Sequence, residues 1–104
     1  MILNIAINYG GRDELVHAFN SLRARGVDNI SADDITAALY TAGCPDPDLI
    51  VRTAGEYRLS NFLLWQSTYS EFYFTDILWP DFKPENVDLA IKEFGRRKRN
   101  FGGV

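Results

Sequence analysis

The sequence lacks several residue types on which whole classes of protein depend. It has a single cysteine, Cys44, and a single histidine, His17, so no internal disulfide can form and a zinc site is disfavoured. No secretory signal and no apolar run of membrane-spanning length is visible. Together these absences fit a reducing compartment, and we expect a cytoplasmic protein.

Positive charge is not in excess either. The 11 lysines and arginines against 14 acidic residues give a formal net charge of −3, which argues against general nucleic-acid binding. What the chain does contain is an ordinary globular composition, with 46% hydrophobic and 24% charged residues. Its 104 residues are enough for one domain at most.

Hydrophobic periodicity and turn residues predict strands that alternate with helices. An apolar run before Gly10 is typical of a buried strand, and helical spacing of apolar residues follows it up to Gly26. Ser31 is expected to cap a second helix, and Pro84 to begin the last one. The expected strands are residues 2–8, 48–53 and 72–75, and the expected helices are residues 12–25, 31–42, 60–70 and the segment from 84 onward. This order predicts an α/β fold: part of a parallel β-sheet flanked by helices, with about three strands and four helices.

The sheet implied by these strands is too small to be complete. Strands of a parallel sheet are buried on both faces, and three strands cannot form a well-covered sheet of that kind. The first expected strand also begins almost at Met1. We therefore expect residues 1–104 to be the second half of a larger domain.

Two arginines and a serine between residues 52 and 60 indicate an anionic ligand. Arg52 and Arg58 flank a loop that leaves a predicted strand, and ligands of open α/β sheets bind at the carboxyl ends of strands. Guanidinium groups bind phosphate in bidentate fashion, and Ser60 with the first N–H groups of the expected helix would complete a diphosphate site. The alternative is that the arginines form surface ion pairs with nearby acidic residues, namely Glu56, Asp46 or Asp48.

Glu71 and the aromatic residues around it have less specific signals. A carboxylate near a diphosphate site is a candidate Mg²⁺ ligand, since Mg²⁺ commonly takes one or two carboxylates plus phosphate oxygens. Taken alone, however, Glu71 is better explained as a surface glutamate or an arginine partner. The run from Phe72 to Phe74 cannot all face one core, so part of it is expected to form a dimer interface.

Two further segments have simple structural explanations. The sequence from Tyr9 to Arg12 follows a predicted strand and holds two glycines, which favours a tight turn over a phosphate-binding loop. The basic run from Arg96 to Arg99 is explained by a solvated helix C-terminus, where positive charge complements the helix dipole.

The order of these residues resembles the C-terminal half of the cis-prenyltransferase family. The segment Arg52–Gln66 is highly specific, because it has many identities in order, including Trp65. The resemblance covers essentially the whole chain, and its segments are Leu3–Arg12, Arg52–Gln66, Glu71–Asp76, Leu78–Phe82 and Phe101–Gly103.

The resemblance implies a Mg²⁺-assisted condensation of isopentenyl diphosphate with an allylic prenyl diphosphate. Pyrophosphate is released, and the product is a Z-polyprenyl diphosphate. Carried onto this sequence, isopentenyl diphosphate would be bound by Arg52, Arg58, Leu59 and Ser60, and Glu71 would be the Mg²⁺ ligand. From the incompletely covered sheet and the aromatic run we expect a homodimer, or tight pairing with the missing half. The lipid product implies peripheral contact with a membrane.

The chain also departs from the family pattern. The family's Asp-Gly-Asn-Gly-Arg-Trp segment, which supplies the aspartate for Mg²⁺ and the first diphosphate, does not occur in these 104 residues, so no catalytic residue is assigned. Tyr57 stands where some relatives have histidine, and Asn100 precedes Phe101 where many have arginine. We expect residues 1–104 to be inactive alone. The alternatives are a non-catalytic partner subunit and a stand-alone diphosphate-binding module.

Overall fold

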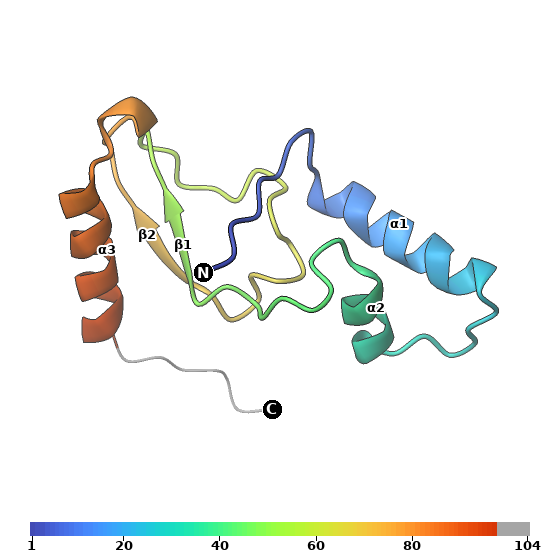
Figure 1. The fold of residues 1–104 in the computed structure, drawn as a ribbon. Helices are drawn as coiled ribbons and strands as arrows, with labels where there is room; N and C mark the ends of the chain where they lie inside the picture. Colours follow the sequence, from blue (N-terminus) through green and yellow to red (C-terminus); the bar gives the residue numbers. More distant parts are fainter. Residues whose placement is uncertain (98–104) are drawn as a thin grey trace. The chain divides into compact units, whose positions relative to one another are not determined.

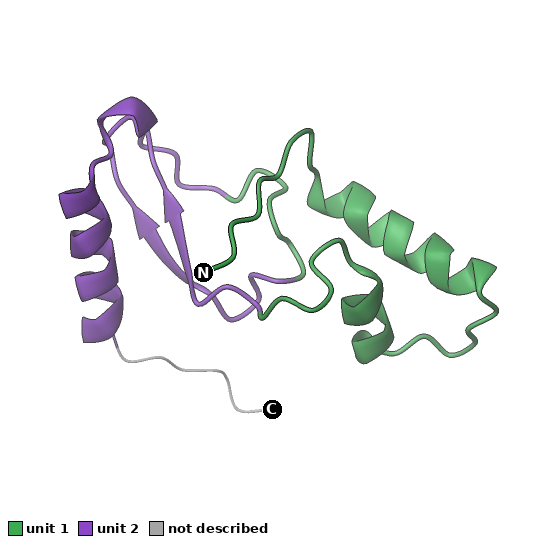
Figure 2. Ribbon diagram, in the orientation of Figure 1, with its two compact units in different colours: residues 1–45, 59–65 green, residues 46–58, 66–104 purple. Residues whose placement is uncertain are grey.

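The computed structural model describes residues 1–97, which fall into two compact units (Figures 1 and 2). Unit 1 comprises residues 1–45 and 59–65, and unit 2 comprises residues 46–58 and the described part of 66–104. Arg99, Asn100 and Phe101–Gly103, to which the resemblance drew attention, lie outside the described residues. Within residues 1–97 no helix combines the length and the apolarity needed to cross a membrane.

Unit 1 is organised around two helices, α1 (Gly11–Ala24) and α2 (Ala32–Ala38). The helices contact each other, and its buried apolar side chains are Ala18, Leu22 and Leu39. Glu14 is only 1% exposed on the same face of α1. Its carboxylate accepts hydrogen bonds from the Tyr9 hydroxyl and, at 2.9 Å, from the Tyr40 N–H. A buried carboxylate is costly unless it is hydrogen-bonded, so these bonds tie the segments before α1 and after α2 to the helix.

The helix ends of unit 1 follow the sequence signals. Asp34 N–H donates to Ser31 Oγ at 3.1 Å and Ser31 N–H donates to Asp34 Oδ2 at 3.0 Å, so the expected capping box forms. Gly26 has φ +76° and its N–H donates to the Arg23 carbonyl at 2.9 Å, which ends α1 as predicted. In contrast, α2 ends at Ala38, four residues before the expected boundary.

Unit 2 holds the sheet, with β1 (Leu49–Arg52) and β2 (Glu71–Phe74). The strands are parallel, and Leu49 is paired with Glu71 and Arg52 with Phe74. A 3-10 turn, η1 (Trp79–Asp81), leads to α3 (Pro84–Arg96), which contacts β2 (Figure 1). The parallel α/β arrangement and the start of α3 at Pro84 are therefore confirmed.

The expected number of elements is wrong: residues 1–97 contain two strands and three α-helices. Residues 2–8 form no strand, and their large apolar side chains are exposed, with Ile2 at 82% and Ile7 at 83%. An apolar run becomes a strand only where a neighbouring strand supplies hydrogen bonds and cover. Among the described residues β1 and β2 pair only with each other, so this run has no such neighbour.

The expected helix over residues 60–70 is also absent, and the segment consists of turns. Ser60, Asn61 and Leu63 have φ of 51°, 67° and 49°, which is left-handed backbone that no α-helix contains. Their backbone is fixed by contacts to a distant part of unit 1.

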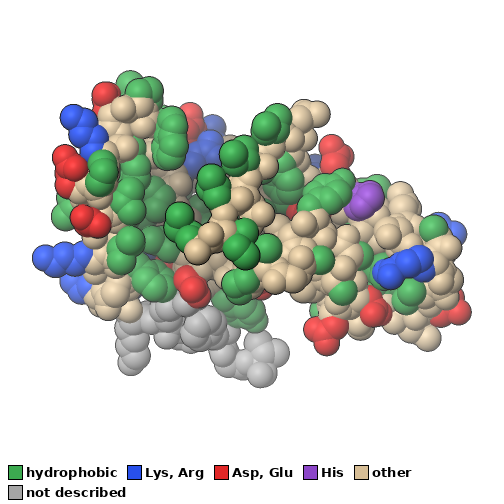
Figure 3. Space-filling model, in the orientation of Figure 1, with side chains coloured by type: hydrophobic (Ala, Val, Ile, Leu, Met, Phe, Trp, Pro, Cys, Tyr) green, Lys and Arg blue, Asp and Glu red, His purple; other side chains and the backbone are tan. Residues whose placement is uncertain are grey.

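Several apolar residues whose helical spacing would favour a place in the core are partly exposed. Phe19 is 47% exposed, and on α3 Val87 and Ile91 are 42% and 57% exposed, whereas Ala90 is buried. Figure 3 accordingly shows hydrophobic side chains at the surface of both units. Each unit therefore has apolar side chains that its own residues do not cover.

Candidate functional site

The two arginines predicted to bind diphosphate flank one loop of unit 2. Arg52 is the last residue of β1 and is half-buried, so it stands at the carboxyl end of the strand as predicted. The Arg58 side chain is 73% exposed, and its Nε lies 3.6 Å from Glu56 Oε2. At that distance the two groups form an exposed ion pair without a tight hydrogen bond. Such a pair adds little to the stability of the fold, so the guanidinium can exchange partners.

The backbone of this loop is held by the segment that follows β2. Ala54 and Gly55 have φ of 63° and 69°, and their N–H groups donate to the carbonyls of Ile77 and Thr75, both at 2.9 Å. These N–H groups are therefore already satisfied within the protein. An anion at this loop would be bound by side chains, foremost the two guanidinium groups.

Tyr57 links the same loop to Asp76. The Tyr57 hydroxyl donates to Asp76 Oδ1 at 3.2 Å, and its ring lies 5.2 Å from that of Phe74. A Cβ at Gly55 would lie 3.1 Å from the same carboxylate oxygen. Asp76 thus contacts the loop on both sides of Glu56. The hydrogen bond to Asp76, and next the charge of Asp76, raise the pKa of Tyr57 above its ordinary value.

We expect Tyr57 to ionise at higher pH than an isolated tyrosine, whose pKa is about 10. Because the folded-state pKa is raised, the stability from this contact is present below the unfolded pKa and is lost as pH rises through the folded pKa. Ultraviolet difference titration of the chain against Tyr57→Phe isolates this residue, and Asp76→Asn should move its pKa downward. An unchanged Tyr57 pKa in Asp76→Asn would contradict the assigned cause.

Glu71 is the first residue of β2 and lies at the opposite end of the sheet from Arg52. Their positions differ by three register steps, which is roughly 10 Å along the strands. The Glu71 side chain is 27% exposed, and its Oε2 lies 3.6 Å from Arg97 Nη1. Arg97 also donates to the Phe72 carbonyl and, through Nε, to Glu93 Oε1 at 3.3 Å.

For Mg²⁺, Glu71 offers a single carboxylate and not a complete protein cage. Residues 1–97 contain no group of three or more acidic, histidine or cysteine side chains placed to hold a metal. Mg²⁺ needs only one or two carboxylates when phosphate oxygens and waters complete its shell. The Glu71 carboxylate is partly exposed, but the Arg97 guanidinium lies 3.6 Å from it and would compete with a cation. This contact is the arginine partner that the sequence left open as the alternative for Glu71.

Arg96 and Arg97, the described part of the basic run, pair within the protein. Arg96 Nη2 lies 2.8 Å from Glu93 Oε1, and Arg97 shares the same carboxylate. Hydrogen bonds from Arg96 hold the pKa of Glu93 below its ordinary value. Local pairing at the end of α3 thus explains these two arginines without a ligand.

Leu59 and Ser60 belong to unit 1, whereas Arg52, Arg58 and Glu71 belong to unit 2. Leu59 is half-buried and Ser60 is exposed. The N–H cradle expected at the start of a helix at Ser60 does not form, because the segment is not helical. The Ser60 hydroxyl is therefore the part of the predicted anion site at this position that is still present.

The Gly10–Gly11 pair is a point of close packing and not a phosphate loop. Gly11 N–H donates to the Asn61 carbonyl at 2.6 Å, and Arg12 N–H donates to Asn61 Oδ1 at 2.9 Å. A Cβ at Gly10 would lie 2.9 Å from Asn61 Nδ2, and one at Gly11 would lie 2.7 Å from Leu64 Cγ. Because these glycines have no side chain, the segment after Ser60 can approach the start of α1 closely.

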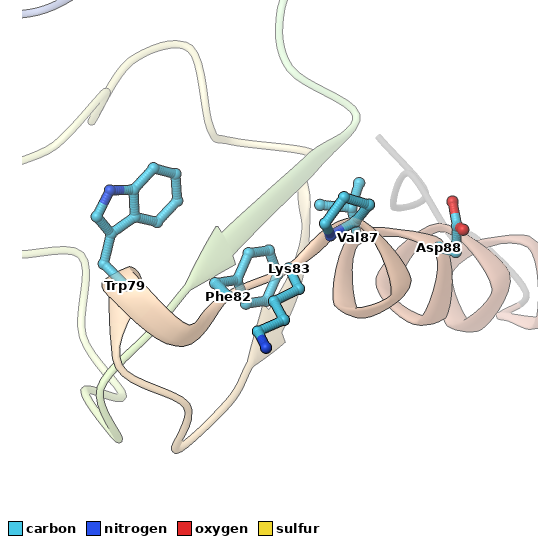
Figure 4. Close-up of a pocket in the computed structure, with 6 residues that line it drawn as sticks. Trp79, Phe82, Lys83, Val87 and Asp88 are labelled. Carbon is cyan, nitrogen blue, oxygen red and sulfur yellow. The ribbon is translucent and has the colours of Figure 1, made fainter.

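A mostly apolar hollow lies elsewhere in unit 2. It has a volume of about 410 Å³, and Figure 4 shows its lining at η1 and the start of α3. The rings of Trp79 and Phe82 stack beside it at 6.2 Å. None of the residues predicted to bind diphosphate or Mg²⁺ lines this hollow.

The sequence alone did not predict that Asn61 caps α1 or that Arg97 pairs with Glu71. Asn61 follows Ser60 directly, and an asparagine beside a site residue is a candidate for left-handed backbone and capping. Arg97 was interpreted only as part of a basic helix end. Glu14 had a signal in its spacing, because it shares one helix face with Ala18 and Leu22.

Comparison with known proteins gives one consistent answer. The family model described as "Putative undecaprenyl diphosphate synthase" matches residues 1–102. The isoprenyl transferase of Clostridium tetani is 50% identical over 110 residues, covering 100% of this chain and 43% of the relative. That of Brucella abortus is 57% identical over 109 residues, covering 98% and 42%. The chain therefore spans less than half the length of these curated relatives.

Solved structures agree with the sequence relatives. Lavandulyl diphosphate synthase from Lavandula x intermedia, in complex with dimethylallyl diphosphate, matches with a TM-score of 0.88 and 40% identity, over 94% of this chain and 45% of that one. A probable undecaprenyl diphosphate synthase from Campylobacter jejuni matches with a TM-score of 0.80 and 37% identity, over 94% and 46%.

Proposed function

The chain belongs to the undecaprenyl diphosphate synthase family of prenyltransferases, and from this premise we propose that it carries the isopentenyl diphosphate site of a cis-prenyltransferase. In the proposed reaction a carbon–carbon bond forms between isopentenyl diphosphate and the first carbon of an allylic prenyl diphosphate. The bond from that carbon to its diphosphate breaks, pyrophosphate leaves, and a proton is lost. Repetition with Z geometry gives a polyprenyl diphosphate.

The observation that carries the proposal is the pair of guanidinium groups flanking one anchored loop at the end of β1. Arg52 and Arg58 would supply two bidentate donors, and within residues 1–97 Arg58 has a loose ion pair with Glu56 at 3.6 Å. Ser60 would add a hydroxyl donor, and Leu59 would lie against the substrate between them. A diphosphate carries several negative charges, so it would displace Glu56 from Arg58.

For Mg²⁺ we propose Glu71 as the ligand from this part of the protein. When bound, Mg²⁺ would neutralise charge on the diphosphate of the allylic substrate and so favour its departure as pyrophosphate. Arg97 would have to release Glu71, which its 3.6 Å separation permits. The remaining ligands would be phosphate oxygens and water.

We further propose that residues 1–104 are the C-terminal half of the catalytic domain and are inactive alone. The chain covers 42–44% of its curated relatives, and it contains no Asp-Gly-Asn-Gly-Arg segment to supply a second carboxylate. The exposed Ile2 and Ile7 support a missing neighbour for this apolar run. The proposed setting is a cytoplasmic homodimer that touches the membrane through its lipid product.

Supplying the N-terminal half of a relative should convert the inactive chain into an active enzyme. Condensation of labelled isopentenyl diphosphate with farnesyl diphosphate is measured for the chain alone, for the relative's half alone, and for both together with Mg²⁺. We expect product only from the mixture, and none when the chain carries Arg52→Ala. Elongation by the chain alone would overturn the proposed incompleteness, and sedimentation of the same samples reports self-association.

A non-catalytic partner subunit is the second candidate, favoured by the apolar side chains that unit 2 leaves exposed, such as Trp79 at 72%. Such a subunit would need the exposed surface but not the anion site. Pyrophosphate binding by calorimetry discriminates between the two functions. A stand-alone diphosphate-binding module is less well supported, because a two-stranded parallel sheet is a small scaffold for independent stability.

A further inference from the structure

The start of α1 receives its cap from a residue far away in the sequence. Gly10 is the N-cap and has no side chain with which to accept a hydrogen bond. The first N–H groups of a helix need acceptors, and here the Asn61 carbonyl accepts from Gly11 at 2.6 Å while Asn61 Oδ1 accepts from Arg12 at 2.9 Å. One residue therefore satisfies two of the free donors of a 14-residue helix.

These two bonds hold Asn61 in a defined place relative to α1. A Cβ at Gly10 would lie 2.9 Å from Asn61 Nδ2, and one at Gly11 would lie 3.1 Å from the Asn61 carbonyl oxygen, so a side chain at either position would push against Asn61. Asn61 is joined to the helix by backbone and side chain together. With both hydrogen bonds in place, neither the backbone nor the side chain of Asn61 can turn away from α1 without breaking one of them.

Ser60, the residue before Asn61, shares its unusual backbone conformation. Ser60 has φ 51° and Asn61 has φ 67°, so two consecutive residues other than glycine are left-handed. Such a conformation is unfavourable for residues other than glycine, and serine has less tendency to adopt it than asparagine. A Ser60 released from the Asn61 contacts would return to extended or right-handed backbone, and its hydroxyl would point elsewhere.

We propose that Asn61 is a positioning residue for Ser60: by capping α1 it holds Ser60 in the left-handed backbone from which its hydroxyl would bind diphosphate. This inference rests on the proposed function, in which Ser60 binds diphosphate. Asn61 itself touches no substrate in the proposal. Its contribution is to keep the left-handed segment formed before the ligand arrives, which removes an ordering cost from binding.

A double-mutant cycle tests the proposal, with inorganic pyrophosphate as the probe and isothermal calorimetry as the measurement. The variants are Ser60→Ala, Asn61→Ala and the double substitution, all in the 104-residue chain. We expect each single substitution to weaken binding roughly three- to tenfold, and Asn61→Ala to have no further effect in the Ser60→Ala background. Independent roles would instead give effects that multiply.

A matched control separates positioning from loss of helix stability. Ser31→Ala removes the hydrogen bond from Asp34 N–H, another helix cap of unit 1, and should lower thermal stability without changing pyrophosphate affinity. Gly10→Ala is a second test that retains Asn61, because the added methyl group should displace the Asn61 side-chain amide. The substitution should weaken pyrophosphate binding in the parent chain but have no further effect in the Ser60→Ala background. It remains informative if Asn61→Ala does not fold.

The outcomes separate two failures. If Ser60→Ala weakens binding but Asn61→Ala and Gly10→Ala do not, the positioning role is wrong and the proposed diphosphate site stands. If Ser60→Ala leaves affinity unchanged, both the role of Ser60 and that of Asn61 are wrong. If Ser31→Ala weakens binding as much as Asn61→Ala, general stability accounts for the effect and the proposal is overturned.

Discussion

Replacing Arg58 by Ala should weaken pyrophosphate binding by roughly 1.5–3 kcal/mol, the range for a hydrogen bond to a charged group. Arg58 lies at the end of the loop from β1, and its side chain is 73% exposed with Glu56 at 3.6 Å as a loose partner. The guanidinium can turn from Glu56 to a diphosphate, where two parallel hydrogen bonds replace one weak ion pair. Calorimetry with pyrophosphate, with and without Mg²⁺, measures the loss directly.

Two further variants decide whether the effect is local. Arg23→Ala removes an exposed positive charge from α1 and should leave the affinity nearly unchanged, since exposed charges are screened by salt. Glu56→Gln frees Arg58 from its ion pair and should strengthen binding slightly. Equal losses from Arg58→Ala and Arg23→Ala would mean that only net charge matters and that the ligand has been misplaced.

Gly11→Ala should destabilise unit 1 by about 1–3 kcal/mol, the usual cost of overpacking a tight contact. The added Cβ would lie 2.7 Å from Leu64 Cγ and 3.1 Å from the Asn61 carbonyl oxygen. Leu64 can turn its side chain aside, but the carbonyl is backbone and is held by a 2.6 Å hydrogen bond to Gly11 itself. Relief therefore requires the segment after Ser60 to move away from α1.

Urea denaturation followed by far-ultraviolet circular dichroism measures this loss, with hydrogen exchange at the α1 amides as the local report. Gly95→Ala is the matched control, because a Cβ there would meet nothing within 4 Å. In the helix α3 that change should stabilise, by up to about 1 kcal/mol. A Gly11→Ala chain as stable as the parent would show that the close approach of Asn61 and Leu64 is not required.

Most local signals in the sequence predicted the structure correctly. Ser31 and Asp34 form their capping box, Gly26 ends α1, and α3 begins at Pro84. Each is decided by residues within one or two turns of the chain, so the sequence contains the whole cause. The likeness to the prenyltransferase family was equally accessible and is confirmed over residues 1–102. The roles of Arg52, Arg58, Leu59, Ser60 and Glu71 stay predictions.

Signals that depend on distant partners were misleading. The apolar run at residues 2–8 has the composition of a strand, but a strand exists only beside another strand, and none of residues 1–97 pairs with it. Phe19 and Val87 have the spacing of core residues, yet 47% and 42% of their surfaces stay exposed. Helical periodicity predicts which residues share a face but not what covers that face.

The segment from Ser60 to Leu63 marks the boundary between local and tertiary information most clearly. A serine and an asparagine directly before an apolar run are typical of a helix start, so the sequence alone predicts a helix here. The tertiary structure decided otherwise, because Asn61 accepts from helix N–H groups 49 and 50 residues away and has left-handed backbone. Two hydrogen bonds and a close glycine contact outweigh a local helix preference that amounts to only tenths of a kcal/mol per residue.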